Sequence, residues 1–305
     1  MALSYQFKAF DTEIMFFAID GKKDLMQKIE KSARDFEKKF SRFDETSELN
    51  KINNRTKPEI KVSAEMLEVL MRAKTAYRLT KGVFDPAVYS ALCSVGYDES
   101  FDLLKKNSAA KNHEKSAAKF SFKKFKINSK TRTIKAPLGL KIDLGGIAKG
   151  FWVDKMKKLL DKNCENYWIN AGGDIFLKGK NEFGENWQLD VQNPLNLNEN
   201  LLSLSIPAKG YGVATSGVTK RQGIRNGKIW NHLIDTRTNL SVKNSILAVT
   251  VIAKSVVDAD VLAKTVLILG VKAGLALVNS MKDYECVIID KNLKIIISRD
   301  LKKFL

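Results

Sequence analysis

The segment KIDLGGIAKGFWVDKM, residues 141–156, most constrains what this chain can fold into. An apolar run, LKIDL, contains Asp143 near its end, the pair Gly145-Gly146 permits a tight turn, and a helical pattern follows. A strand, a glycine turn and a helix N-terminus bring free N–H groups and a helix dipole together, which favours an anion such as phosphate. Lys149 would add a positive charge there, and Asp143 would accept a hydrogen bond from a ribose or a base edge.

The same segment has a purely structural interpretation, in which the glycines only turn the chain and Lys149 is solvated. It lacks the G-x-G-x-x-G pattern of a Rossmann fold and the GK[ST] ending of a P-loop. Neither of these two nucleotide-binding folds is therefore predicted.

Length favours either one large domain or two lobes around a cleft, and we predict a single domain over residues 1–305. No apolar run approaches the roughly 20 residues that span a bilayer, so no transmembrane segment is expected. The N-terminus shows no signal-peptide pattern, which predicts a cytoplasmic protein. An exported or membrane-anchored protein whose leader had been removed would look the same. The three cysteines are far apart, so neither disulfides nor a zinc site is predicted.

The formal net charge of +18 would attract polyanions of several kinds. The lysines are scattered, and no nucleic-acid-binding signature accompanies them. We therefore expect no nucleic-acid partner, and polyanion binding is only a fallback interpretation.

Hydrophobic periodicity predicts a mixed α+β protein. We expect a strand around 7–19 with a turn at Asp20-Gly21, helices over 24–40, 63–80 and 259–269, short strands between 125 and 255, and a hairpin over 285–298. Lys81-Gly82 is a C-cap signal that predicts the end of the second helix. Residues 105–124 are rich in lysine, alanine and serine, which predicts a solvated surface loop or insertion.

Further segments hold small residues and acids at the expected ends of strands or helices. They are SRFDETSELNKIN (41–53), GVFDPAV (82–88), YWINAGGDIFLKG (167–179), GVATSG (212–217), WNHLIDTRTN (230–239) and DADVLAKTVLILG (258–270). Together with 141–156, their order and spacing resemble the FAD:protein FMN transferase family, the ApbE-like flavin transferases, from about Phe10 to Gly270. The resemblance implies a compact two-lobed α+β fold with antiparallel sheets flanked by helices.

The resemblance also implies a reaction. FAD, the substrate, is split at its pyrophosphate, FMN is attached through a phosphoester to a threonine or serine of an acceptor flavoprotein, and AMP is released. Mg²⁺ would neutralise the pyrophosphate.

Residue by residue, the resemblance gives three sets of sites. The flavin-nucleotide contacts are Phe10, Phe43, Val83, Phe84, Asp85, Asp143, Lys149, Leu233 and Ile234. His232 would lie beside the pyrophosphate and act as the catalytic base, although a lone histidine beside LID is more often structural. The carbonyl of Gly146 and the carboxylate of Asp260 would bind the metal.

Three departures from the family pattern lie near these residues. Lys264 stands where the family has a hydroxyl ligand for the metal, so its ammonium would repel Mg²⁺ or replace it. Thr265 could provide the hydroxyl ligand instead, although its side chain points about 100° further around the helix than the side chain at position 264. SGVTKR (216–221) replaces Ser-Gly-Asp-Tyr-Glu-Arg, and AFDT (9–12) lacks Met-Gly before Thr12. These departures leave open a flavin-nucleotide-binding protein with little or no transferase activity. An FAD pyrophosphatase is a second alternative, because the same cleavage follows if water takes the place of the acceptor.

Overall fold

The chain forms two compact units in a computed structural model that describes residues 2–99, 120–225 and 228–305. Unit 1 is made of residues 1–34, 149–220 and 244–305, and unit 2 of residues 35–148 and 221–243. A single domain over 1–305 stays a prediction. Residues 105–119 of the surface loop expected at 105–124 lie outside the described residues.

Unit 1 is built on an eight-stranded sheet whose neighbouring strands are all antiparallel, in the order β1-β2-β6-β7-β10-β15-β16-β17. Its strands are β1 (Leu3–Ala9), β2 (Thr12–Ala18), β6 (Tyr167–Ala171), β7 (Asp174–Lys178), β10 (Tyr211–Gly217), β15 (Ile246–Ala253), β16 (Glu285–Asp290) and β17 (Ile295–Ile297). A two-stranded ribbon of β8 (Trp187–Asn193) and β9 (Asn196–Ile206) belongs to the same unit. Its helices are the first part of α1 (Asp24–Phe40), α6 (Ala148–Leu160), α7 (Val256–Leu269), α8 (Val271–Asn279) and the 3-10 helix η3 (Leu301–Phe304).

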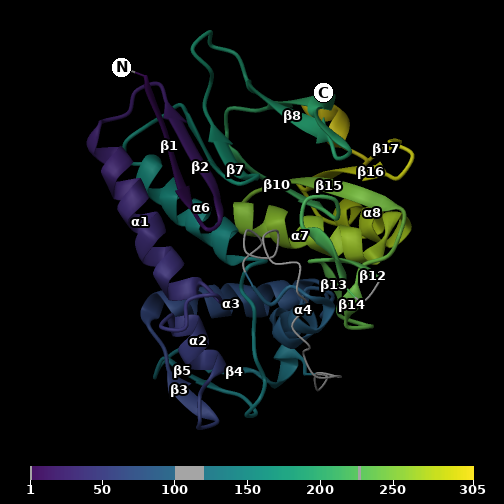
Figure 1. Cartoon of the computed structure of the whole chain (residues 1–305). Helices are drawn as coiled ribbons and strands as arrows, with labels where there is room; N and C mark the ends of the chain where they lie inside the picture. The colour runs from purple at the N-terminus through teal and green to yellow at the C-terminus, as the bar shows by residue number, and fades with distance from the viewer. Residues whose placement is uncertain (1, 100–119, 226–227) are drawn as a thin grey trace. The chain divides into compact units, whose positions relative to one another are not determined.

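Helix α7 packs against β7, β10 and β15 in unit 1 (Figure 1). It is apolar around almost its whole circumference, and Asp258, Lys264 and Leu269 are its only residues that are not buried. A helix of this kind belongs to a core rather than to a surface. The buried carboxylate of Asp260 on this helix therefore lies in a largely apolar environment. Among the described helices, none is both long and apolar enough to cross a membrane.

The N-terminal segment differs from the single strand predicted around 7–19. It is a hairpin, in which β1 pairs with β2 and Ala9 lies opposite Thr12. The two turn residues, Phe10 and Asp11, have φ angles of 59° and 52°. Apolar and polar residues alternate in β1, and buried and half-buried residues alternate along the apolar part of β2, so no break in the pattern marks the turn. The turn also lacks the Asn-Gly or Gly-Gly pair that usually marks a hairpin.

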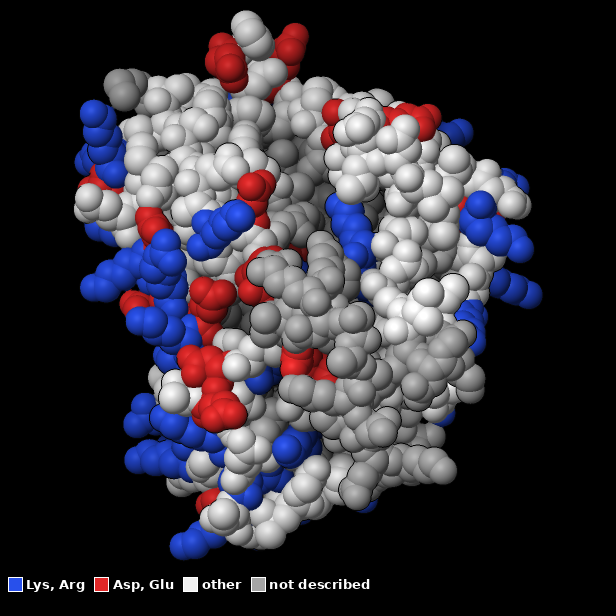
Figure 2. All heavy atoms as spheres, in the orientation of Figure 1, with Lys and Arg blue, Asp and Glu red and all other residues white. Residues whose placement is uncertain are grey.

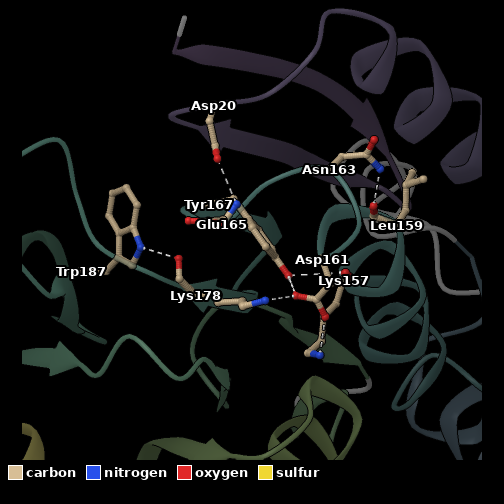
Figure 3. Close-up of polar contacts among 9 residues, drawn as sticks. All are labelled: Asp20, Lys157, Leu159, Asp161, Asn163, Glu165, Tyr167, Lys178 and Trp187. Carbon is tan, nitrogen blue, oxygen red and sulfur yellow. Dashed lines mark hydrogen bonds and ion pairs between the residues drawn. The ribbon is translucent and has the colours of Figure 1, made fainter. Parts of the chain in front are cut away.

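The C-terminal end of α6 is tied to strands β6 and β7 by one carboxylate (Figure 3). Asp161 accepts hydrogen bonds from the Tyr167 hydroxyl at 2.9 Å, from Lys178 Nζ at 2.7 Å and from Lys157 Nζ at 2.8 Å. These contacts fix the helix on the sheet at the end opposite to the glycine turn.

Unit 2 contains helices and short strands. They are the end of α1, α2 (Glu48–Asn53), β3 (Glu59–Lys61), α3 (Ala64–Leu79), η1 (Pro86–Val88), α4 (Tyr89–Val95), η2 (Phe122–Lys124), β4 (Lys126–Asn128), β5 (Thr133–Lys135), β11 (Gln222–Arg225), β12 (Lys228–Asn231), β13 (Ile234–Asp235) and β14 (Leu240–Ser241). Ser63 caps α3 by accepting from the N–H of Met66, and Lys81 and Gly82 leave the helix with φ angles of 52° and 84°. The predicted cap at Lys81-Gly82 is confirmed.

The predicted strand LKIDL is wrong. Residues 140–144 belong to no strand and pair with none of the described strands. The Asn53 side chain donates to the carbonyl of Ile142 at 2.9 Å and accepts from its N–H at 2.8 Å, while the N–H of Asp143 donates to the carbonyl of Pro86 at 2.8 Å. The side-chain amide of Asn53 and the carbonyl of Pro86 in η1 thus provide the hydrogen bonds that a neighbouring strand would provide. The apolar residues of the run are buried, which is why the sequence looks like a strand.

Charged side chains of both signs share the face shown in Figure 2, where acidic groups lie among the lysines and arginines.

Candidate functional site

The residues expected to form the site fall into both units. Unit 1 holds Phe10, Lys149, Asp260, Lys264 and Thr265. Unit 2 holds Phe43, Val83, Phe84, Asp85, Asp143, Gly146, His232, Leu233 and Ile234.

Asp260 and Lys264 lie one turn apart on α7, the buried helix of unit 1. The Asp260 side chain is 3% exposed, and its Oδ1 accepts a hydrogen bond from Lys264 Nζ. Its other oxygen, Oδ2, is buried without a hydrogen-bond partner among the described residues. Thr265, the next residue, donates its hydroxyl proton to the carbonyl of Val261 at 2.7 Å and is fully buried. The carboxylate therefore has an ammonium as its partner, and the hydroxyl is used within the helix.

A second buried ion pair joins α6 to the turn between β6 and β7. Lys149 Nζ donates to Asp174 Oδ2 and to the carbonyl of Ala171 at 3.3 Å. The turn itself, Gly172-Gly173, has φ angles of 62° and 96°. A Cβ on Gly172 would lie 2.2 Å from the Thr12 hydroxyl oxygen, so this position needs glycine. The GGD pattern thus holds a carboxylate against Lys149.

The two ion pairs act on each other electrostatically. Burial raises the pKa of Asp260, and the negative charge of Asp174 raises it further, whereas Lys264 and Lys149 lower it. Two carboxylates and two ammonium groups give this cluster no net formal charge. We call Lys149, Asp174, Asp260 and Lys264 the four-charge cluster.

The residues of unit 1 do not fit a magnesium ion in this arrangement. Mg²⁺ takes about six oxygen ligands at about 2.1 Å. Here one oxygen of Asp260 is bound to Lys264, Asp174 Oδ2 is bound to Lys149, and the Thr265 hydroxyl faces a backbone carbonyl. Among residues 2–99, 120–225 and 228–305, no group of three or more histidine, cysteine or acidic side chains could hold a metal ion. The Lys264 ammonium forms an ion pair with the Asp260 carboxylate, which the family pattern assigns to the metal.

Phe10, in the turn of the β1–β2 hairpin, packs edge-on against Trp152 of α6. The ring centroids are 5.3 Å apart and the planes meet at 65°. The hairpin turn is thereby fixed on the first half of α6, close in sequence to Lys149.

In unit 2, Asp143 has two kinds of partner. Its Oδ1 accepts from the N–H of Gly145 at 2.8 Å, which forms the turn before α6 that also contains Gly146. Its Oδ2 is 3.4 Å from Nε of Arg42, whose guanidinium lies 4.5 Å from the ring centre of Phe43 and 4.2 Å from that of Tyr97. Arg42 Nη2 is buried without a hydrogen-bond partner among the described residues. A buried guanidinium thus lies over two rings, which meet each other edge-on with centroids 6.3 Å apart, and its Nε is close to the predicted nucleotide-contacting acid.

His232 contacts the same aromatic group through Tyr97. Its ring meets Tyr97 edge-on, with centroids 6.3 Å apart, and Tyr97 stacks on Trp230 at 5.9 Å. His232 Nδ1 is 3.3 Å from the carbonyl oxygen of Arg221. A proton on Nδ1 would donate to that carbonyl and leave the lone pair on Nε2. Leu233 and Ile234, which follow, are buried.

Asp85 caps the 3-10 helix η1. Its carboxylate accepts from the N–H of Ala87 at 2.8 Å, from the N–H of Phe122 at 3.0 Å and from the Ser121 hydroxyl at 2.9 Å. Burial raises the pKa of Asp85, although these hydrogen bonds lower it. Its contact with a nucleotide stays a prediction, because the structure gives the carboxylate a local role.

Val83 and Phe84 come just before Asp85. The carbonyl of Val83 accepts from the Thr236 hydroxyl at 3.3 Å, and the N–H of Phe84 donates to Thr80 Oγ1 at 3.0 Å. Phe84 is buried, whereas Val83 is half-buried. The backbone of this segment is held in place on both sides.

Sequence reasoning missed Arg42, Tyr97 and the pairing of Asp174. Arg42 is one of 52 basic residues, and nothing in its neighbourhood distinguishes it from a solvated one. Asp174 carried a signal, since it follows two glycines directly, but its partner Lys149 is 25 residues away in the sequence.

The comparisons with known proteins agree with one another. The model of the ApbE family matches residues 1–288. The chain belongs to the ApbE family. The FAD:protein FMN transferase of Haemophilus influenzae is 30% identical over 253 residues, which cover 80% of this chain and 72% of the relative. The enzyme of the same name from Vibrio cholerae is 28% identical over 293 residues, covering 94% and 86%.

Solved ApbE structures also resemble the whole chain. The flavin transferase ApbE from Vibrio cholerae matches with a TM-score of 0.84 at 25% identity and covers 100% of this chain and 99% of its own. The ApbE protein from Thermotoga maritima matches with a TM-score of 0.88 at 24% identity, with the same coverage. The predicted family and the α+β class are both confirmed.

Proposed function

We propose that this ApbE-family chain is an FAD:protein FMN transferase. The observation that carries the proposal is the match to enzymes of that name, which extends over 72% of one relative and 86% of another. The substrate is FAD, and the second partner is a flavoprotein with a threonine or serine at the acceptor position.

The reaction is a phosphoryl transfer. The acceptor hydroxyl oxygen attacks the phosphorus of the FMN half of FAD and forms a new P–O bond. The bond between that phosphorus and the bridging oxygen breaks, and its electron pair leaves on the phosphate of AMP. The hydroxyl proton must be taken up by a base, and the charge on the leaving AMP must be balanced.

We assign the proton to His232. It is the only histidine among the described residues, and its Nδ1 lies 3.3 Å from the carbonyl of Arg221, which favours the tautomer with the lone pair on Nε2. Tyr97 packs against its ring and restricts its orientation. The chain would thereby present one nitrogen as a base in a fixed direction.

Nucleotide binding is assigned to both units. In unit 2, Phe43 is exposed and lies on the Arg42 guanidinium beside Asp143, so a ring system and a carboxylate are available for a flavin nucleotide. In unit 1, Phe10 and Lys149 lie on the hairpin turn and the first turn of α6. No step of the reaction is assigned to Mg²⁺ in this chain.

The test separates transfer from its two alternatives by the nucleotide products. The purified chain is incubated with FAD, with and without a threonine-containing acceptor, and AMP, FMN and FAD are measured by chromatography. AMP without an equal amount of free FMN, only when acceptor is present, supports transfer. AMP and free FMN in equal amounts indicate a pyrophosphatase, and intact, bound FAD indicates a binding protein; either result contradicts the proposal.

A further inference from the structure

We propose that Lys264 takes the place of a divalent cation at Asp260, so that this chain binds no such ion there and turns over FAD without one. The inference about turnover rests on the proposed function. The inference about ion binding stands on the four-charge cluster alone.

The first support is the position of the lysine. Asp260 and Lys264 are four residues apart with the acid first, which is the favourable order for an ion pair on a helix. Both side chains are mostly buried, 3% and 17% exposed, and Lys264 Nζ contacts Asp260 Oδ1. In water such a pair contributes little, but within an apolar helix neither charge is stable without the other. The ammonium is therefore held at this carboxylate.

The second support is the charge of the cluster. Asp174 and Asp260 contribute two negative charges, and Lys149 and Lys264 contribute two positive ones. A hydroxyl residue at position 264 would leave one net negative charge, and a divalent cation would then be attracted. With Lys264 the cluster is already neutral, so an added dication would meet no attracting net charge and would be repelled by an ammonium on its own ligand.

The third support is the lack of ligands. Only Asp260 Oδ2 lacks a hydrogen-bond partner among the buried carboxylate oxygens of the described residues. Thr265, the neighbouring hydroxyl, points to the carbonyl of Val261, so it does not replace the missing ligand at position 264. One carboxylate oxygen is far from the roughly six oxygens that Mg²⁺ requires.

The proposal is tested on the intact chain with Mn²⁺ as the probe, followed by electron paramagnetic resonance. We expect no saturable binding to the wild type and saturable binding to K264S, which restores a hydroxyl. The matched control is K28S, because Asp24 and Lys28 form a pair with the same spacing and order on an exposed part of α1. Saturable Mn²⁺ binding to the wild type that D260N abolishes would overturn the proposal, and this result does not depend on whether K264S folds.

The second arm measures AMP release from FAD with EDTA or with added Mg²⁺. We expect the wild type to change by less than about twofold and K264S to lose at least about tenfold in EDTA, with recovery in Mg²⁺. A wild type that loses about tenfold in EDTA and recovers in Mg²⁺ contradicts the proposal. If no AMP forms under any condition, the proposed function fails, and the Mn²⁺ titration still decides whether Lys264 excludes the ion.

Discussion

Nε of Arg42 lies 3.4 Å from Oδ2 of Asp143, in a pair whose side chains are 7% and 11% exposed. The guanidinium also lies over the rings of Phe43 and Tyr97, which contact each other edge-on. This relationship connects the predicted nucleotide-contacting acid of unit 2 to its aromatic residues. Because Arg42 acts through these neighbours, we regard it as a positioning residue.

Replacing Arg42 by methionine should leave Asp143 buried without its cation. We expect the free energy of unfolding to fall by on the order of 3 kcal/mol, and the Kd for FAD to rise by about tenfold as Asp143 and Phe43 lose their fixed positions. Urea unfolding and FAD fluorescence titration measure the two effects. R34M is the control, since Arg34 pairs with Glu30 on an exposed helix face and should cost less than about 1 kcal/mol. An unchanged FAD Kd in folded R42M would exclude the positioning role.

Replacing His232 by alanine should remove the proton acceptor but leave the nucleotide contacts. We expect kcat for FMN transfer to fall by at least about a hundredfold, while the Kd for FAD changes little. Single-turnover kinetics and FAD titration on the same preparation separate the two quantities. Transfer at the wild-type rate in H232A would remove this residue from the mechanism.

The Lys149–Asp174 pair allows structural and functional roles to be separated. K149M should destabilise unit 1 by about 3–5 kcal/mol because Asp174 stays buried and charged. The double variant K149M/D174N should recover most of that stability, since no charge is left unpaired. If Lys149 also contacts the substrate, FAD turnover should stay low in the stable double variant. Full recovery of turnover would reduce Lys149 to a structural role.

The Asp161 network predicts a dependence of stability on pH. Burial acts to raise the pKa of Asp161, but hydrogen bonds from Lys157, Lys178 and Tyr167 outweigh it, so the net effect lowers the pKa below its usual value. A lowered folded-state pKa stabilises the protein above the unfolded pKa of about 3.9, and this contribution is lost as the pH falls through the folded-state value. Urea unfolding between neutral pH and pH about 3 should therefore show a difference between wild type and D161N that shrinks on acidification. A difference independent of pH would contradict the assignment.

The elements that can be predicted from the sequence are those with a local signal. Helix α1 is found at both ends because its apolar residues repeat with the helical period and polar residues flank them. The end of α3 is found because a glycine directly after a helical pattern is a common C-terminal signal, and Gly82 indeed has a positive φ angle.

The elements that cannot be predicted depend on partners far away in the chain. The segment around Ile142 looks like a strand, but the Asn53 side chain, 89 residues earlier, takes its hydrogen bonds. In the site, the sequence marks Lys149 and Lys264 as candidate site residues. The ion pairs of Lys149 with Asp174 and of Lys264 with Asp260 form only when the sheet and α7 are folded, and so does the electrostatic interaction between the two pairs. Arg42 carries no local signal of its stacking.

The most direct measurement is the intact mass of a threonine-containing acceptor flavoprotein after incubation with this chain and FAD. The proposed transferase predicts a gain equal to the mass of FMN less one water, with an equal amount of AMP released. An acceptor whose threonine is replaced by valine should gain nothing. An unmodified threonine acceptor, with FAD either intact or split into free FMN and AMP, would contradict transfer as the function of this chain.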